Sequence, residues 1–380
     1  MQTVQVHQEP AQPPEETHCT IVGGGITGLT AALALQSQGV AVTVVDKGQG
    51  IGGRLASRRL RWDPDPQVIG IADYGALQFQ VSDRRFQTQV DRWVEQGLLR
   101  SEVPSNLLPS ATRSPVSALA QPFYTGTASL RSFTQALSQG LTLHLKTRIT
   151  QLHWQPSTQS WILSALNAAG SPVTLPWQST HLVLTCPVPQ TLELLDQSGI
   201  AIPPAQRQPL QSVHYHPCLT ALLLLRHPSQ IPPPGLIAGR DPELPEALQA
   251  LRCHYRSGIS PQGYAVTLQA SPTFSQQHWD QDDRSILETL ITLASPWLNL
   301  TPSSADGLLT QQLHRWRYSQ PAQSYAQTDR PCCILQPTLI LGGDAFATPD
   351  HPPISPHLSL QQGFLSGLSI AETIVGVNRG

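Results

Sequence analysis

Three glycines near the start of the chain have the spacing that a bound pyrophosphate requires. Gly23, Gly25 and Gly28 form the pattern GxGxxG, and Asp46 follows Gly25 by 21 residues. In such a pattern the first glycine allows a tight turn, the second leaves room for a pyrophosphate, and the third lets a helix pack closely on a strand. An acid at that distance accepts hydrogen bonds from the adenosine ribose hydroxyls. The pattern predicts a dinucleotide site; the alternative is a glycine turn that serves packing alone.

The residues around these glycines predict the elements that such a site needs. Apolar residues indicate a buried strand at 18–22, a helix at 26–38 and a second strand at 41–46. The free N–H groups and the positive end of the helix dipole would then face the phosphates. Besides the glycines and the acid, the expected cofactor contacts on this βαβ unit are Ile26, Thr27 and Lys47.

The segment after Asp46 separates a flavin site from a simple NAD site. A simple dehydrogenase would run directly into its next helix, whereas this chain continues DKGQGIGGRLASRR. Gly52, Gly53 and Arg54 resemble the GGR signature of flavin amine oxidases, in which the arginine would reach a phosphate or the flavin-proximal part of the cofactor. At least one of the arginines that follow is interpreted as part of a solvated basic loop: Arg58, Arg59 and Arg61.

Two further segments resemble flavin-binding parts of the same superfamily. ADYGALQF resembles the D-x-G-A segment beside the isoalloxazine ring, through Asp73 and Gly75, although Asp73 is equally typical of a turn. ILGGDAF resembles the place where Gly343 and Asp344 contact the ribityl chain or pyrophosphate. A helix follows it, and its dipole would stabilise a reduced, anionic flavin. With Ile149 on a central strand, these residues complete the predicted site of a noncovalently bound FAD.

Beyond these cofactor motifs, the whole chain after residue 17 resembles the renalase family. YTGTASLRSF, LTCPVPQTL, VHY and HRWRYSQ occur in the order and near the spacing of that family. Generic amine oxidases do not share the run Trp316-Arg317-Tyr318. The resemblance implies oxidation of 2- and 6-dihydro isomers of NAD(P)H, dihydronicotinamide nucleotides, to NAD(P)+ by hydride transfer to flavin N5. It also implies O2 as the acceptor, reduced to H2O2.

Such a reaction needs little from protein side chains. Hydride transfer from a dihydropyridine requires stacking and alignment but no general base. Many amine oxidases, in contrast, have a lysine bonded to a water near N5. This sequence contains only Lys47, which adjoins the ribose acid, and Lys146, which is expected on a central strand. The candidates for a slot that accepts a flat nicotinamide, together with an arginine for substrate phosphate, are Phe79, Tyr124, Tyr215, Trp316, Tyr318 and Arg317.

Two other functions remain open from the residues. One is an FAD-dependent amine oxidase or desaturase of an apolar substrate, and the other is a flavin-fold binding protein that does no redox work. The loop at 347–360 is longer and richer in proline than this resemblance leads one to expect, and Gln362 stands where an acid is common. These departures concern substrate access and the last flavin contacts.

Composition and charge narrow the class of partner. The chain has 380 residues and a formal net charge of −2, so we expect no binding to nucleic acid. Six scattered cysteines without CxxC spacing indicate a reducing compartment. A secretory signal and a run of about 20 apolar residues are both missing, which predicts a cytoplasmic protein without a membrane span. His214, His216 and Cys218 suggest a metal trio, but a packed strand is favoured because no fourth ligand is evident.

The order of elements predicts an α/β fold with two domains, since single cores seldom exceed about 250 to 300 residues. A Rossmann-like FAD-binding domain of the p-hydroxybenzoate hydroxylase or amine oxidase type would comprise 18–76, 126–190 and 335–380. A second, α+β substrate domain on a mixed sheet would comprise 77–125 and 191–334, after a disordered tail at 1–17. Further strands are expected at 141–152, 161–165, 181–185, 219–225, 264–270 and 338–341, and further helices at 127–137, 283–293 and 361–375.

Overall fold

The computed structural model describes residues 17–102, 122–238, 244–300, 307–325, 330–347 and 358–378. The expected tail, apart from Thr17, lies outside these residues, as does most of the proline-rich loop at 347–360. Of the helices described, none is long and apolar enough to cross a membrane.

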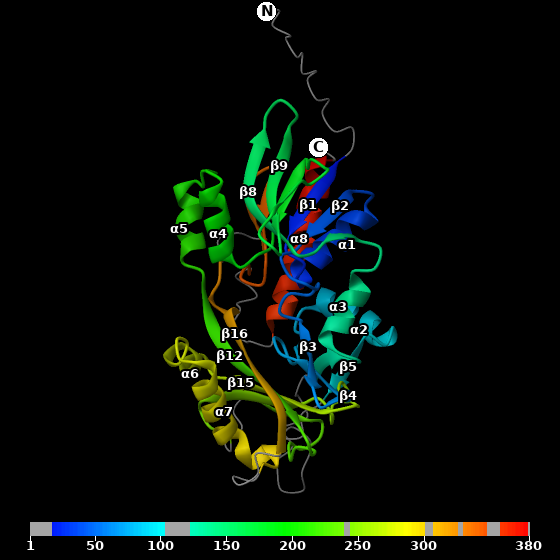
Figure 1. Ribbon diagram of the computed structural model, residues 1–380. Coiled ribbons are helices and arrows are strands. Elements are labelled where there is room, and N and C mark those ends of the chain that lie inside the picture. The colour runs from blue at the N-terminus through cyan, green and yellow to red at the C-terminus, as the bar shows by residue number, and fades with distance from the viewer. Residues whose placement is uncertain are drawn as a thin grey trace, which may run out of the picture.

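A mainly parallel sheet carries the predicted βαβ unit at one end of the molecule (Figure 1). Its strand order is β17, β18, β11, β1, β2, β7, and the edge strand β17 alone runs antiparallel to its neighbour. The strands are β1 His18–Val22, β2 Ala41–Val45, β7 Thr142–His144, β11 His181–Leu184, β17 Cys333–Gln336 and β18 Leu339–Leu341. The sheet confirms the expected Rossmann-like class.

Two layers cover this sheet. Helices α1 (Ile26–Ser37) and α8 (Ser359–Asn378) pack together in one hydrophobic cluster with its strands. The other cluster joins the sheet to an antiparallel sheet of β8 (Thr147–Gln155), β9 (Ser160–Asn167) and β10 (Pro172–Val173). The single strand expected at 141–152 is wrong, because Lys146 has a φ of 54° and divides β7 from β8. Lys146 therefore lies in a turn.

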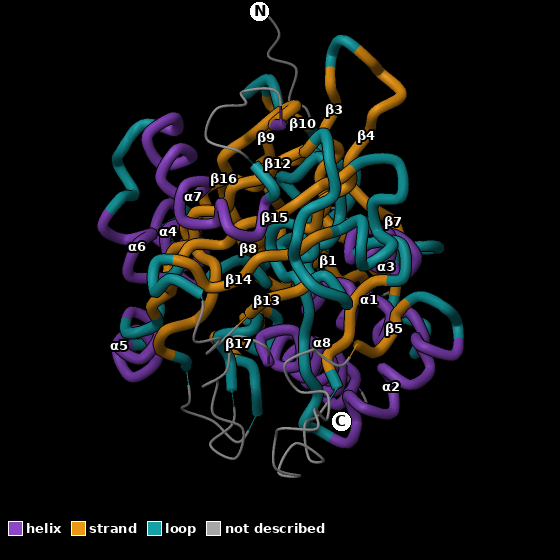
Figure 2. Tube along the Cα trace, turned by 90° about the horizontal axis from the view of Figure 1, so that it is seen from below, coloured by secondary structure: helices purple, strands orange, loops and turns teal. Residues whose placement is uncertain are grey.

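The second half of the molecule is built on a five-stranded antiparallel sheet, seen from below in Figure 2. Its order is β13, β14, β15, β12, β16, and helix α7 packs on one face. The long strands β12 and β16 extend toward the first sheet (Figure 1). The elements are β12 His214–Leu225, β13 Leu236–Ala238, β14 Leu248–Cys253, β15 Tyr264–Ala270, α6 Pro272–Gln277, α7 Asp283–Leu298 and β16 Leu308–Gln323.

Two segments pack differently from the expected division into domains, which otherwise stays a prediction. The hairpin β3–β4 (57–62 and 65–73) was expected in the FAD-binding domain, yet Leu60 and Ala72 pack on strands β12 and β15. Residues 77–102 were expected in the substrate domain, yet their aromatic side chains pack with α8. The remaining elements are α2 Arg84–Glu95, β5 Leu99–Glu102, β6 Phe123–Gly126, α3 Leu130–Leu137, α4 Val188–Gln197 and α5 Pro204–Gln211.

Candidate functional site

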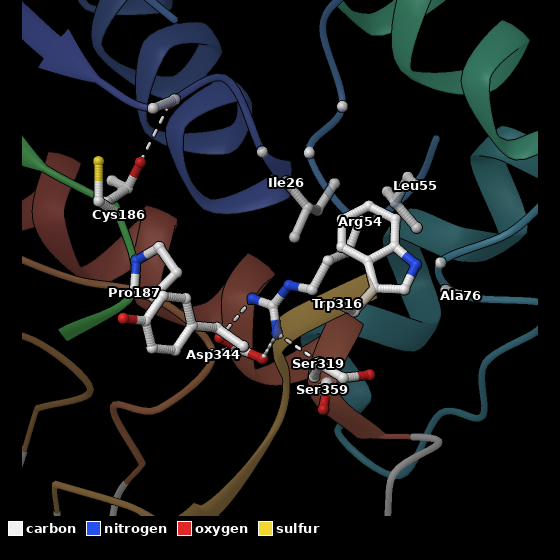
Figure 3. Close-up of a pocket in the computed structure, with 18 of the residues that line it drawn as sticks. Ile26, Arg54, Leu55, Ala76, Cys186, Pro187, Trp316, Ser319, Asp344 and Ser359 are labelled. Atoms are coloured by element: carbon white, nitrogen blue, oxygen red, sulfur yellow. Dashed lines mark hydrogen bonds and ion pairs between the residues drawn. The ribbon is translucent and has the colours of Figure 1, made fainter. Parts of the chain in front are cut away.

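A cavity of about 760 Å³ runs from the glycine turn of the first sheet to the face of the second (Figure 3). That volume is within the range of small-molecule sites. Its walls come from segments far apart in the sequence, including the β1–α1 turn, the residues around Arg54, strand β16, and the turn after β18. From the predicted cofactor site, the lining residues are Gly23, Gly25, Ile26, Thr27, Asp46, Lys47, Gly53, Arg54, Gly75, Ile149, Gly343 and Asp344.

The glycine turn at the mouth of α1 has the shape of a phosphate cradle. Gly23 has a φ of +116°, and a Cβ on Gly28 would lie 1.9 Å from the Gly23 carbonyl oxygen, so both positions require glycine for the fold. Gly25 differs from them: its φ of −76° suits any residue, and a Cβ there would meet no atom within 4 Å. No side chain caps α1, and its first turn holds no acid. This open, uncapped N-terminus fits a pyrophosphate.

Asp46 marks the nucleoside end of the cavity. Its two carboxylate oxygens accept hydrogen bonds from the N–H groups of Gly24 and Gly48, each at 2.6 Å. These bonds fix the carboxylate at the edge of the cavity, where ribose hydroxyls can donate to its remaining lone pairs. The neighbouring Lys47 ammonium donates to Gln190 on α4 at 3.3 Å.

Arg54 lines the cavity, its guanidinium is paired with other residues of the protein, and its contact with the cofactor stays a prediction. The guanidinium donates to both carboxylate oxygens of Asp344 at 2.7 Å and to the carbonyl oxygen of Ser319 at 2.8 Å (Figure 3). Burial alone would lower the pKa of Arg54, but the charge and hydrogen bonds of Asp344 raise it. Arg54 thus joins the segment after β2 to β16 and to the turn after β18.

Trp316 lies on the wall of the cavity beside Arg54 (Figure 3). Its indole N–H donates to the Tyr74 carbonyl oxygen at 2.8 Å, and its ring stacks on the Tyr74 ring with centroids 5.2 Å apart. His314, two residues earlier on β16, meets the indole edge to face at 4.5 Å. Tyr318 follows on the same strand and also lines the cavity. This aromatic wall suits a flat ring.

Arg317 lines the cavity, and its role as a ligand of substrate phosphate stays a prediction. Alternation along β16 sends its side chain to the opposite side from Trp316. The Arg317 guanidinium lies 6.0 Å from the ring centroid of Trp279, next to α6. Although Arg317 lines the cavity, its positive charge therefore lies away from the aromatic wall.

Three other aromatic candidates do not line the cavity. Phe79 and Tyr124 stack on each other with centroids 5.6 Å apart inside the aromatic core. Tyr215 lies behind Tyr318, and its hydroxyl accepts a hydrogen bond from the Val188 N–H at 3.4 Å. The sequence shows that such residues are large and aromatic, but only the tertiary packing decides which of them border a cavity.

Asp73 also departs from its expected place beside the flavin. It is fully buried, is not part of the cavity wall, and accepts hydrogen bonds from the Ser57 hydroxyl and the Leu130 N–H. These bonds anchor the first turn of α3 against the β3–β4 hairpin. On β12, His214 and His216 are exposed whereas Cys218 is buried, and the pairing with β16 shifts register between His216 and Cys218.

Asp73 predicts a dependence of stability on pH. Burial raises its pKa to about 6, with hydrogen bonds from Ser57 and Leu130 opposing the rise. The pKa in the unfolded chain is about 3.9, so this carboxyl stabilises the fold below about pH 4 relative to higher pH. That contribution is lost as the pH rises through 6, on the order of 3 kcal/mol.

Asp73→Asn removes this titration while keeping an acceptor for Ser57. The difference in free energy of unfolding, variant minus wild type, is expected to increase between pH 4 and pH 6 and to stay constant from pH 7 to pH 8. Urea denaturation at each pH measures it. A difference that does not change between pH 4 and 6 would contradict the raised pKa.

Several cavity residues were not among the predicted site residues. Thr185 and Cys186 follow β11, Ser359 begins α8, and His314 lies on β16. Glutamines from three segments also line the cavity: Gln78, Gln249 and Gln269. Glutamine is common on the surface of this chain, so nothing in its spacing singles these three out.

Comparisons with known proteins agree with this geometry. A model of the NAD(P)-binding Rossmann-like domain family matches residues 21–94. Renalase of Mus musculus is 25% identical over 342 residues, which cover 86% of this chain and 92% of renalase. The 4,4′-diapophytoene desaturase (4,4′-diaponeurosporene-forming) of Staphylococcus haemolyticus is 34% identical over 74 residues, only 19% of this chain and 15% of the desaturase.

A solved structure extends the likeness to the fold as a whole. The crystal structure assigned as a protoporphyrinogen oxidase from Exiguobacterium sp. 255-15 superposes with a TM-score of 0.62. It covers 94% of this chain and 98% of that chain at 14% sequence identity, so it shows the fold alone. The fold class and the resemblance to renalase are both confirmed.

Proposed function

We propose that this chain, an FAD-dependent oxidoreductase similar to renalase over most of its length, oxidises 2- and 6-dihydro isomers of NAD(P)H to NAD(P)+. Noncovalent FAD would be held by the α1 cradle and Asp46, with Arg54 and Asp344 further along the cavity. FAD bound there would supply N5 as the hydride acceptor, with O2 as the final acceptor reduced to H2O2. The observation that carries the proposal is that the described cavity lining holds neither an unpaired carboxylate nor a lysine beside the aromatic wall.

The carboxylates that line the cavity, among the described residues, all have other partners. They are Asp46, Glu193 and Asp344. Asp46 accepts from two backbone N–H groups and Asp344 binds Arg54. Glu193 accepts from Gln197 on α4, near the nucleoside end. A substrate at the aromatic wall thus meets no carboxylate that is free to take a proton.

The lysine of many amine oxidases has no counterpart either. Lys47 donates to Gln190 at the nucleoside end, and Lys146 lies in the β7–β8 turn outside the cavity wall. The sequence contains no other lysine. The cavity is therefore suited to a substrate that gives up a hydride without first losing a proton, as a dihydropyridine does.

The remaining requirement is alignment of the substrate ring, which the aromatic wall provides. Trp316 is fixed by its bond to Tyr74 and offers a rigid face on which a flat ring can stack. Burial, with a smaller effect of Arg58, lowers the pKa of His314 to about 4, so this side chain is neutral at pH 7. The wall thus excludes water without presenting a charge to the ring.

An anaerobic stopped-flow titration tests the proposal. We expect 6-dihydro-NAD to bleach the flavin absorbance near 450 nm at least 100-fold faster than ordinary NADH, because only the isomer places its hydride toward N5. Equal rates for the two compounds would refute the proposed substrate. Rapid bleaching by an apolar amine or polyene instead would favour an amine oxidase or desaturase, and a colourless purified protein would favour a binding module.

A further inference from the structure

Three uncharged amide side chains line the cavity where the second sheet borders it. Gln269 on β15 and Gln249 on β14 lie on neighbouring strands, since Gln269 pairs with Ala250. Gln78 comes from the segment after β4, and Gln269 bonds to Gly75 of that same segment. Leu77 and Ala250, the chain neighbours of Gln78 and Gln249, pack together with Leu236. The three residues, called the glutamine cluster below, thus share one corner of the cavity.

Gln269 has a fixed orientation. Its Nε2 donates to the Gly75 carbonyl oxygen at 2.5 Å, and a carbonyl can only accept, so the amide cannot be the other way round. Its Oε1 receives no hydrogen bond from any described residue. Gln269 therefore offers an acceptor that a ligand must satisfy with an N–H or O–H group.

The side-chain amides of Gln78 and Gln249 form no hydrogen bond with any residue that the structure describes. Gln78 is 93% buried, and its Oε1 has no hydrogen-bond partner. Gln249 occupies a register shift between Leu248 and Ala250, the kind of irregularity that redirects a side chain. No described residue bonds to the Gln249 amide. A buried amide without a partner costs free energy, which a bound polar group would offset.

We infer that the glutamine cluster binds a neutral primary carboxamide of the substrate. The inference rests on the proposed function, in which that group is the carboxamide of the nicotinamide ring stacked on Trp316. The two N–H groups of the carboxamide donate to Gln269 Oε1 and Gln78 Oε1, and its oxygen accepts from the amide N–H₂ of Gln249. Each group is then matched by one of opposite hydrogen-bonding character.

The cluster discriminates against the two alternative kinds of group. A carboxylate has no hydrogen to donate to Gln269 Oε1, and no positive charge stands in the cluster to offset its desolvation. A hydrocarbon would leave the amides unpaired. An arginine or lysine would have been the ordinary partner of an acid, and neither belongs to this corner of the cavity wall as described.

The product NAD+ and its nicotinic acid analogue, deamido-NAD+, differ only in this group. A comparison of their binding affinities therefore tests the inference. Titrated into the oxidised holoenzyme and followed by the change in flavin absorbance, NAD+ is expected to bind at least tenfold more tightly. Benzamide and benzoate repeat the comparison without a nucleotide. Equal affinities within both pairs, tighter binding of the acids, or no binding of any of the four would overturn the carboxamide site.

The variants Gln249→Leu and Gln78→Leu test whether the preference for NAD+ over deamido-NAD+ arises from the glutamine cluster. Each is expected to weaken NAD+ about tenfold and to leave deamido-NAD+ unchanged, so the preference disappears. Gln312→Leu is the matched control, since Gln312 bonds to Arg58 on the sheet and lies outside the cavity wall. It should keep the preference. If the variants of the cluster keep it too while their melting temperatures match that of wild type, the assignment to these residues is wrong.

These outcomes are independent of turnover. A holoenzyme that prefers NAD+ over deamido-NAD+ but is not reduced by 6-dihydro-NAD would retain the carboxamide site and lose the proposed reaction. Rapid reduction by 6-dihydro-NAD without any preference between NAD+ and deamido-NAD+ would support the proposed reaction and rule out the carboxamide site.

Discussion

A Gly25→Val protein is expected to fold with the stability of wild type and to be purified without flavin. The backbone at Gly25 has a φ that valine adopts readily, and a Cβ there meets no protein atom within 4 Å. The added side chain instead occupies the open space at the N-terminus of α1, where the pyrophosphate would lie. The measurements are the thermal unfolding midpoint of the apoprotein and the absorbance near 450 nm after purification with added FAD.

Gly376→Val is the control for this change. Gly376 is an exposed helical position of α8 whose Cβ would also meet nothing within 4 Å. The control protein should be yellow. A yellow Gly25→Val protein with an unchanged affinity for FAD would show that the pyrophosphate lies elsewhere, because the cradle leaves no room for both.

Asp344→Leu is expected to lower the free energy of unfolding of the apoprotein by about 3 kcal/mol. The side chain of Asp344 is only 6% exposed, and it holds the guanidinium of Arg54 through two hydrogen bonds. Its removal leaves a partly buried cation without its counter-ion, which costs more than the loss of an exposed pair. Urea denaturation of the apoproteins measures the change.

The double variant Arg54→Met with Asp344→Leu distinguishes the cost of leaving Arg54 unpaired from the cost of lost packing. Removing both charges should recover most of the stability, because no unpaired cation remains. Asp196→Leu is a contrasting single change, since the pair of Asp196 with Arg207 is exposed and should contribute little. If the double variant is as unstable as the sum of its single changes, Arg54 and Asp344 do not act as a pair.

The parts of the fold that follow from nearby residues could be predicted. The β1–α1–β2 unit needs only the apolar runs and the glycine turn between 18 and 46, and the structure has all three elements there. Helix α7 begins at Asp283 as expected and continues to Leu298, five residues beyond the predicted end, through Pro296. Local propensity could not anticipate that a proline would be accommodated inside the helix.

The parts of the site that depend on long-range packing could not be predicted. Asp73 and Phe79 belong to a segment that resembles a flavin-binding motif, but that segment turns them into the core and exposes Gly75 and Ala76 to the cavity instead. The GGR resemblance suggested that Arg54 reaches a phosphate or the flavin-proximal part of the cofactor, but it gave no sign of the pair with Asp344, which is remote in the sequence. Hydrogen bonds over such separations leave no pattern in a single sequence.

The separation between Arg54 and Asp344 also sets an order of events during synthesis of the chain. The phosphate cradle is complete once the first strand, helix and second strand have left the ribosome. The carboxylate that holds Arg54 emerges 290 residues later, followed by helix α8, which packs on α1. The cradle residues are therefore synthesised well before Asp344 and α8, and the cavity is complete only once these later segments have packed against the first sheet.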